Sequence, residues 1–201
     1  PSITYIVKEG DTPQSIANKF GISVSDILKY NYYSQDEYFS AGQKIAISGY
    51  APRHYAVVPW EDSGPTKYGK LVDWYYDGQY ILKRWKKIII TDVMTGLRFN
   101  ATVIGGYNHA DIEPDTKSDT AIMHKMFDYS WEWTPRPVVV YIEGMNIAAS
   151  LSGMPHSFDI ISDNNMNGHC DLYLKNSRPH GSYVSEDYVQ QHYKAVYDAS
   201  R

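Results

Sequence analysis

Residues 7–12 read Val-Lys-Glu-Gly-Asp-Thr, and this stretch decides the fold of the N-terminal part of the chain. Tyr5 and Val7 alternate with polar neighbours, which predicts a half-buried strand ending at the Gly-Asp-Thr turn. Thr12 is a good helix N-cap, and Pro13 stands at the first helical position, where proline is tolerated. The spacing therefore predicts a strand that is followed directly by a helix.

The residues that follow complete a small α/β unit. Gly21 ends the first helix, and Ser23 begins a second one. Ile45 and Ile47 then return the chain to the sheet as a second strand. This strand–helix–helix–strand order over residues 2–48 resembles the LysM domain, a module that binds N-acetylglucosamine polymers such as peptidoglycan and chitin. The resemblance implies a partner of this class and a location in the cell wall or outside the cell.

The resemblance also implies where the glycan binds. In LysM domains the sugar lies between the first strand–helix loop and the second helix–strand loop. The matching substrate-binding positions in this chain are Gly10, Asp11, Thr12 and Pro13 in the first loop, and Asn31, Tyr32 and Tyr33 in the second.

The bulk composition excludes several other partners. The chain has 19 Lys and Arg against 23 Asp and Glu, a net charge of −4, so it lacks the basic surface typical of nucleic-acid binding. No apolar run approaches the roughly 18 residues of a membrane span. The single cysteine allows no intramolecular disulfide. Because the chain opens directly on the first strand, no signal peptide is visible, and we expect a removed leader or delivery by a phage, spore or lysis route.

The rest of the chain predicts a second, β-rich domain, so that the fold class is α+β. We place the LysM unit at residues 2–48, a linker at residues 49–70 and the β-rich domain at residues 71–201. Within the linker, residues 54–58 are compatible with a short strand. In the second domain we predict strands at 87–91, 97–103, 137–142, 147–151 and 172–174, a helix capped by Ser118 or Asp119, and a final helix from Ser185.

Reactive side chains are concentrated in the segment of residues 154–181. A thiolate nucleophile needs a nearby base, and His169 directly precedes Cys170, while His156 lies earlier in the same loop. The first hypothesis is therefore a cysteine enzyme that needs no cofactor, with Cys170 as the nucleophile and His156 or His169 as the base. Arg178 is suited to clamp a substrate carboxylate, and His180 is a further candidate for substrate binding.

This spacing resembles the L,D-transpeptidases (the YkuD type), β-rich enzymes that are often fused to a LysM domain. Their cysteine takes an acyl group from a peptidoglycan stem peptide and passes it to an amine of a neighbouring stem. The resemblance implies transfer or hydrolysis at stem peptides by this chain. In this sequence no glycine separates His169 from Cys170, and Leu172 stands where the family has an arginine.

Four further motifs resemble an uncharacterised group of LysM-containing bacterial proteins. They are Thr-Asp-Val-Met-Thr-Gly at residues 91–96, His-Ala-Asp-Ile-Glu-Pro at 109–114, Ser-Gly-Met-Pro-His at 152–156 and Asn-Ser-Arg-Pro-His-Gly at 176–181. That group also carries the motif Gly-His-Phe-Cys-x-His-Phe. When this motif is aligned without gaps from Gly168, Asp171 stands at the position of its cysteine and Tyr173 at the position of its second histidine.

Two alternatives to the cysteine enzyme stay open. The first is a metal-dependent peptidoglycan hydrolase, because zinc takes three or four ligands from the side chains that gather here. Its candidate ligands are His109, Asp111, His156, His169 and Asp171, with His180 as a further donor. The second is a wall-binding or assembly protein without catalysis, which the replacements at positions 171 and 173 favour.

Overall fold

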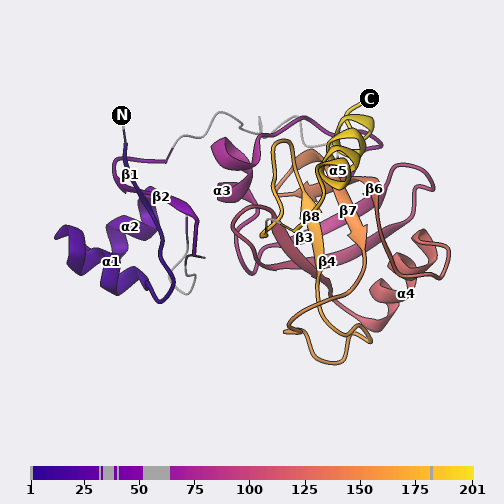
Figure 1. The fold of residues 1–201 in the computed structure, drawn as a ribbon, viewed down its shortest axis with the longest axis horizontal. Helices are drawn as coiled ribbons and strands as arrows, with labels where there is room; N and C mark the ends of the chain where they lie inside the picture. Colours follow the sequence, from indigo (N-terminus) through magenta and orange to yellow (C-terminus); the bar gives the residue numbers. More distant parts are fainter. Residues whose placement is uncertain (1, 32, 34–38, 40, 52–63, 182) are drawn as a thin grey trace.

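The computed structural model describes residues 2–31, 33, 39, 41–51, 64–181 and 183–201 (Figure 1). Tyr32 and the strand suggested at residues 54–58 lie outside these described residues. The fold is α+β, as predicted: an N-terminal βααβ unit is followed by a β-rich part that contains a closed six-stranded antiparallel barrel. No helix in the described ranges is long and apolar enough to cross a membrane.

The N-terminal unit is a two-stranded antiparallel sheet covered by two helices. Strands β1 (Ile3–Ile6) and β2 (Lys44–Ser48) pair with each other, and helices α1 (Pro13–Phe20) and α2 (Val24–Tyr30) lie between them in the chain. Its buried core consists of Val7, Ile16, Ala17, Ile27, Leu28, Phe39 and Ile45.

The predicted helix ends of this unit are confirmed. Thr12 caps α1 through a reciprocal pair of hydrogen bonds with Ser15: the Ser15 N–H donates to Thr12 Oγ1 (3.0 Å) and the Thr12 N–H donates to Ser15 Oγ (2.9 Å). Gly21 follows α1 in the left-handed conformation, and the Ser23 hydroxyl caps α2. These local signals place both helices without help from the rest of the chain.

The barrel has the strand order β3-β4-β5-β8-β7-β6, closed by pairing between β3 and β6. Its strands are β3 (Lys87–Asp92), β4 (Arg98–Gly105), β5 (Ala110–Pro114), β6 (Glu132–Ile142), β7 (Met145–Gly153) and β8 (Cys170–Tyr173). The interior is filled by apolar side chains from all six strands, among them Ile90, Val103, Ile112, Val140, Leu151 and Leu172. Because the interior is a packed core, the residues that alternate with these apolar side chains lie on the outer face.

Within the described residues, four further helical segments accompany the barrel. They are η2 (Trp74–Gly78), α3 (Gln79–Ile81), α4 (Lys117–Met126) and α5 (Glu186–Asp198). Helix α5 begins at the predicted cap, Ser185, and packs across β6 and β7 (Figure 1).

Several predicted elements need correction: β6 begins at Glu132, five residues before the predicted strand at 137–142, and strand β5 was not predicted. Helix α4 is capped by Thr116, not by Ser118 or Asp119, because Thr116 Oγ1 accepts from the Asp119 N–H (3.2 Å). The Asp119 carboxylate instead accepts a hydrogen bond from the Asn100 N–H (2.8 Å). This bond ties the helix to β4. Strand β8 begins at Cys170, two residues before the predicted strand, because the β5 ladder extends to that position.

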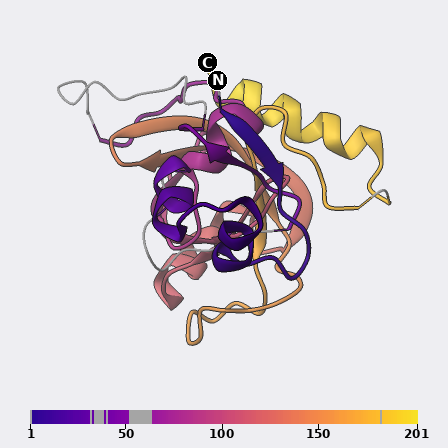
Figure 2. The same cartoon turned by 90° about the vertical axis from the view of Figure 1, so that its left-hand side faces the viewer.

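The N-terminal unit contacts the barrel part through α3. The Tyr80 hydroxyl donates to the Lys44 carbonyl of β2 (2.9 Å), and its ring packs against Ala46 and Ala51. Figures 1 and 2 show α3 on the side of the barrel that faces the N-terminal unit.

Candidate metal centre

Two neighbouring strands of the barrel carry the same short motif. Strand β5 and the residue before it read His-Ala-Asp at residues 109–111, and β8 with its preceding residue reads His-Cys-Asp at 169–171. Asp111 and Asp171 are direct partners in the antiparallel β5–β8 ladder. Side chains two residues apart share one face of a strand, so both acids and both histidines lie on the outer face of the barrel.

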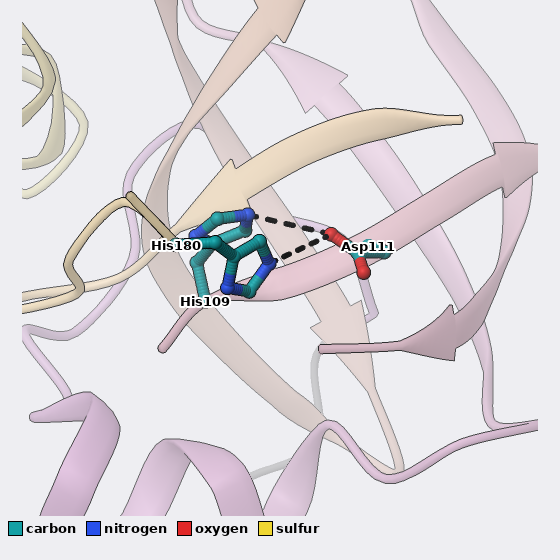
Figure 3. Close-up of side chains that lie close together, drawn as sticks. All are labelled: His109, Asp111 and His180. Atoms are coloured by element: carbon teal, nitrogen blue, oxygen red, sulfur yellow. Dashed lines mark ion pairs between the residues drawn. The ribbon is translucent and has the colours of Figure 1, made fainter. Parts of the chain in front are cut away.

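Four imidazoles converge on these two carboxylates. His109 Nε2 lies 3.3 Å from Asp111 Oδ1 and 3.1 Å from Asp171 Oδ1. His156 Nε2 lies 3.3 Å from Asp171 Oδ1. His169 Nε2 and His180 Nε2 each lie 3.7 Å from Asp111 Oδ1. Figure 3 shows His109 and His180 directing ring nitrogens at the Asp111 carboxylate from the same side.

Backbone carbonyls orient three of the four imidazoles. His109 Nδ1 lies 2.7 Å from the Arg178 carbonyl oxygen. His156 Nδ1 lies 2.8 Å from the carbonyl oxygen of residue 154, and His169 Nδ1 lies 3.0 Å from that of residue 158. Because a carbonyl oxygen only accepts, each Nδ1 carries the proton and donates it, which leaves the Nε2 lone pair for the cluster. Metal-binding histidines are commonly held in this way.

Glycines allow the chain to approach these histidines closely. His156 and His169 exchange two backbone hydrogen bonds of 2.9 Å each, which close the loop between them. A Cβ on Gly168, whose φ is +99°, would lie 2.5 Å from the His156 carbonyl oxygen. A Cβ on Gly106 would overlap the carbonyl oxygen of His109. Both positions therefore require glycine for the cluster to form.

A buried carboxylate fixes the loop that joins His156 to His169. Glu113 is fully buried on β5 and accepts hydrogen bonds from the Ile160 N–H (2.8 Å) and the Ile161 N–H (2.7 Å). Burial nevertheless raises the Glu113 pKa. The loop is thus tied to the strand that carries Asp111.

The cluster is strongly coupled electrostatically. Burial alone would lower the pKa of His109, but hydrogen bonding and charge from Asp111 and Asp171 outweigh it and raise that pKa to about 10. Burial would raise the pKa of Asp111, but the neighbouring histidines, first His109 and then His180, lower it to about 2. Burial would likewise raise the pKa of Asp171, but His109 and His156 outweigh it and lower that pKa. Both acids are therefore ionised at neutral pH, and a bound cation would take over the positive charge that His109 otherwise supplies to them.

The positions of the polar atoms fit a bound cation. His109 Nε2, Asp111 Oδ1 and Asp171 Oδ1 are buried, and among the described residues they meet one another at ion-pair distance but have no partner at hydrogen-bonding angles. A zinc ion with ligands at 2.0–2.1 Å in a tetrahedron separates neighbouring ligand atoms by about 3.4 Å. The contacts of 3.1–3.7 Å between the histidine and aspartate atoms match that spacing. Nitrogen and carboxylate oxygen are also the donors that zinc takes.

The cluster lies at the wall of a cleft of about 890 Å³. Aromatic side chains form much of its rim: Trp133 is 45% exposed, Phe158 52% and Tyr183 99%. His156 and His180 are the cluster residues most open to solvent, with side chains 28% and 35% exposed. A ligand in the cleft would therefore meet the cluster from the side of these two histidines.

The structure does not bring Cys170 to this cleft. Its side chain points into the barrel core, where it is fully buried among the apolar residues of the interior. Burial raises the pKa of its thiol well above the usual value, and the charges of Asp171 and Glu113 raise it further. A thiol in this setting packs as a small apolar group, and burial disfavours the thiolate form that a nucleophile needs.

The other predicted site residues take different places. Arg178 contributes its backbone carbonyl to His109, while its guanidinium is exposed and its pKa is raised by a hydrogen bond to Tyr193. His180, predicted to bind substrate, stands in the cluster beside His109, with ring centroids 4.0 Å apart. The sequence also offered His180 as a metal donor, although no local spacing links it to the other histidines.

The predicted glycan-binding residues are only partly exposed. Gly10 and Thr12 lie at the surface, and the Asp11 carboxylate accepts hydrogen bonds from Tyr5 Oη (2.7 Å) and the Lys8 N–H (2.8 Å). Asn31 is fully buried: its side chain donates to the Ala46 carbonyl (2.7 Å) and accepts from the Ala46 N–H (2.7 Å). Asn31 therefore ties α2 to β2.

Comparison with known proteins identifies the N-terminal unit alone. Residues 5–48 match the family model of the LysM domain. No curated protein and no solved structure matches the chain. The LysM match indicates that the chain binds peptidoglycan or chitin and associates with a cell wall.

Proposed function

We propose that this protein is a metal-dependent peptidoglycan hydrolase that cleaves amide bonds of the peptide stems. One observation carries the catalytic part of this proposal: four histidine Nε2 atoms converge on two aspartate Oδ1 atoms at the wall of a cleft. The LysM match supports the choice of peptidoglycan as the substrate polymer. In this proposal residues 2–48 bind the glycan and residues 71–201 carry the catalytic site. Residues 49–70 are the linker between these two domains.

The metal ligands would be the four histidines and two aspartates of the cluster. A zinc ion bound there would act as a Lewis acid and lower the pKa of a water molecule. The chain holds the ligands in place through the three carbonyl contacts to Nδ1 and through the β5–β8 ladder. His156 and His180 lie toward solvent, so the accessible side of the cluster faces the cleft.

The cleft suits a short peptide. Its volume of about 890 Å³ is in the range of sites that enclose small ligands. The exposed rings of Trp133, Phe158 and Tyr183 offer apolar surface for the aliphatic parts of a stem peptide. On the N-terminal unit, the exposed loop of Gly10 and Thr12 is the part of the predicted groove that is open to a glycan.

The buried thiol does not support the alternative in which Cys170 attacks a stem peptide. A peptide carbonyl in the cleft would be separated from the sulfur by strand β8 itself, because Cys170 and Asp171 project to opposite faces. Transpeptidase chemistry of the thiol type would need a different conformation of this strand.

The test is mass spectrometry of muropeptides after the full chain is incubated with purified sacculi. Wild type would be compared with chelator-treated and zinc-restored protein, and with the variants His169→Ala and Cys170→Ala. His124→Ala is the matched control, because His124 lies on α4 outside the cluster. Circular dichroism would confirm that each variant is folded.

We expect cleaved stems from the wild type, Cys170→Ala and His124→Ala, and none after chelation or from His169→Ala. Loss of cleavage in folded Cys170→Ala that still binds zinc would overturn the metal mechanism in favour of the thiol. Zinc binding with unchanged muropeptides would instead identify a wall-binding protein with a structural metal.

A further inference from the structure

We infer that the cluster binds two divalent cations side by side, and not one. This inference rests on the proposed metal site and concerns how many ions it holds. The ion sets would be His109, Asp111 and His180 for one cation, and His156, His169 and Asp171 for the other.

The first support is the symmetry of the ladder. Adjacent antiparallel strands are related by a local two-fold axis, and here that axis passes between the paired residues Asp111 and Asp171. Each strand carries its histidine two residues before its acid, so His109 and His169 lie on opposite sides of the acid pair. One His-x-Asp motif thus repeats the other across the axis.

The second support is that each motif is completed by its own loop histidine. His180 lies beside His109, with ring centroids 4.0 Å apart, and His156 lies beside His169, with centroids 4.7 Å apart. Within each set of three residues, the ligand atoms all lie within 4.8 Å of one another. Each set therefore offers two imidazoles and one carboxylate, and each has one histidine that is partly exposed to the cleft.

The third support is the position of the carboxylates between the sets. Asp171 Oδ1 is 3.1 Å from His109 Nε2 of the other set, and Asp111 Oδ1 is 3.7 Å from His169 Nε2 of the other set. Carboxylates placed in this way can bridge two ions, which in dinuclear hydrolytic sites lie about 3.5–4 Å apart.

The unsatisfied atoms are also distributed over both sets. His109 Nε2 and Asp111 Oδ1 belong to the first set, and Asp171 Oδ1 belongs to the second. All three are buried, and none has a partner at hydrogen-bonding angles in the part of the chain that the structure describes. Six donors exceed the three or four protein ligands that a single zinc ion takes, so one ion would leave some of them unused.

The number of bound ions can be measured directly. Tag-free full-length protein would be stripped with a chelator, saturated with zinc, passed through a desalting column and examined by native and inductively coupled plasma mass spectrometry. The variants are His180→Ala and His156→Ala, one from each set, chosen because these partly exposed side chains disturb packing least. His124→Ala, outside both sets, is the control.

We expect about two zinc ions per chain in the wild type and in His124→Ala, about one in each single variant, and none in a variant with both substitutions. Saturated wild type with one ion per chain would overturn the two-ion inference while leaving the metal-dependent hydrolase intact. Saturated wild type without zinc would overturn both. Manganese-loaded protein gives an independent reading, because two ions at such a distance produce a spin-coupled electron paramagnetic resonance spectrum and a single ion does not.

Discussion

Cys170 and Asp171 are neighbours in the chain, but their side chains project to opposite faces of strand β8. Cys170 is buried in the barrel core, whereas the Asp171 carboxylate lies in the cleft, 3.1 Å from His109 Nε2. The alternation of side chains along a strand is the cause, since one face of β8 is turned inward. The side chain of β8 that contacts the histidines is therefore the Asp171 carboxylate.

This relationship predicts contrasting effects of substitution at the two positions. Cys170→Ala should leave zinc affinity unchanged and cost about 1 kcal/mol of stability, because it removes one buried sulfur from the core. Asp171→Asn should weaken zinc binding about 100-fold or more, because it removes a charged ligand. Competition with a chromophoric chelator would measure both affinities. Equal zinc affinity of Asp171→Asn and wild type would contradict the assignment.

The thiol itself should be unreactive in the folded protein. Because Cys170 is fully buried and its pKa is raised by burial, iodoacetamide should label it only after denaturant unfolds the chain. Mass spectrometry of native and denatured samples would give the labelled fractions. Rapid labelling under native conditions at neutral pH would restore the cysteine hypothesis.

Buried His192 should make the protein less stable in mild acid. Burial lowers its pKa from 6.5 to about 3, so below pH 6.5 the unfolded chain takes up a proton that the folded chain does not. Its contribution to stability is thus complete above pH 6.5 and is lost as the pH falls toward 3. Between pH 7.5 and 5.0 the loss from this residue should be about 2 kcal/mol.

Urea denaturation at the two pH values would test this for wild type and His192→Gln. The glutamine retains a polar partner for Ser150, whose Oγ lies 2.8 Å from His192 Nδ1. We expect the pH-dependent change in unfolding free energy to be smaller in His192→Gln by about 2 kcal/mol. His124→Gln, on the surface side of α4, should behave as wild type. Equal pH dependence in His192→Gln and wild type would rule out this source of acid sensitivity.

Glu113 should position the metal-binding loop without binding metal. Glu113→Gln keeps one acceptor oxygen but loses the second, so one of the two loop amides, Ile160 N–H or Ile161 N–H, is left without its partner. We expect a loss of about 1–3 kcal/mol in stability and about 10-fold weaker zinc binding. The nearby exposed Asp159→Asn is the control, with both quantities near wild type. Unchanged zinc affinity in Glu113→Gln would show that the loop holds its histidines without this anchor.

The N-terminal cap should stabilise the LysM unit by itself. Thr12→Ala removes the side-chain acceptor of the capping box and should cost about 1 kcal/mol. Ser25→Ala, at an exposed position in the first turn of α2, should change stability by less than about 0.5 kcal/mol. Chemical denaturation followed by circular dichroism would compare them. Equal stability of the two variants would mean that α1 is held by packing alone.

Local sequence was sufficient for the N-terminal unit. Thr12, Pro13, Gly21 and Ser23 set the helix ends through contacts within a few residues, and the structure has those ends where we predicted them. The same reasoning found the α+β class, several barrel strands and all six residues of the cluster as possible metal donors. These features follow from periodicity, capping and the chemistry of the side chains, all of which are local.

Only the tertiary structure decided which of the reactive side chains meet. The sequence could not say which face of β8 is inward, because that depends on closure of the barrel and on the register that pairs Asp111 with Asp171. Nor could it bring His180 to His109, since their contact is made by a distant loop that donates a carbonyl to the same imidazole. The sequence by itself thus determined the reactive groups that are present, and long-range strand pairing determined that the aspartate, and not the cysteine, faces the histidines.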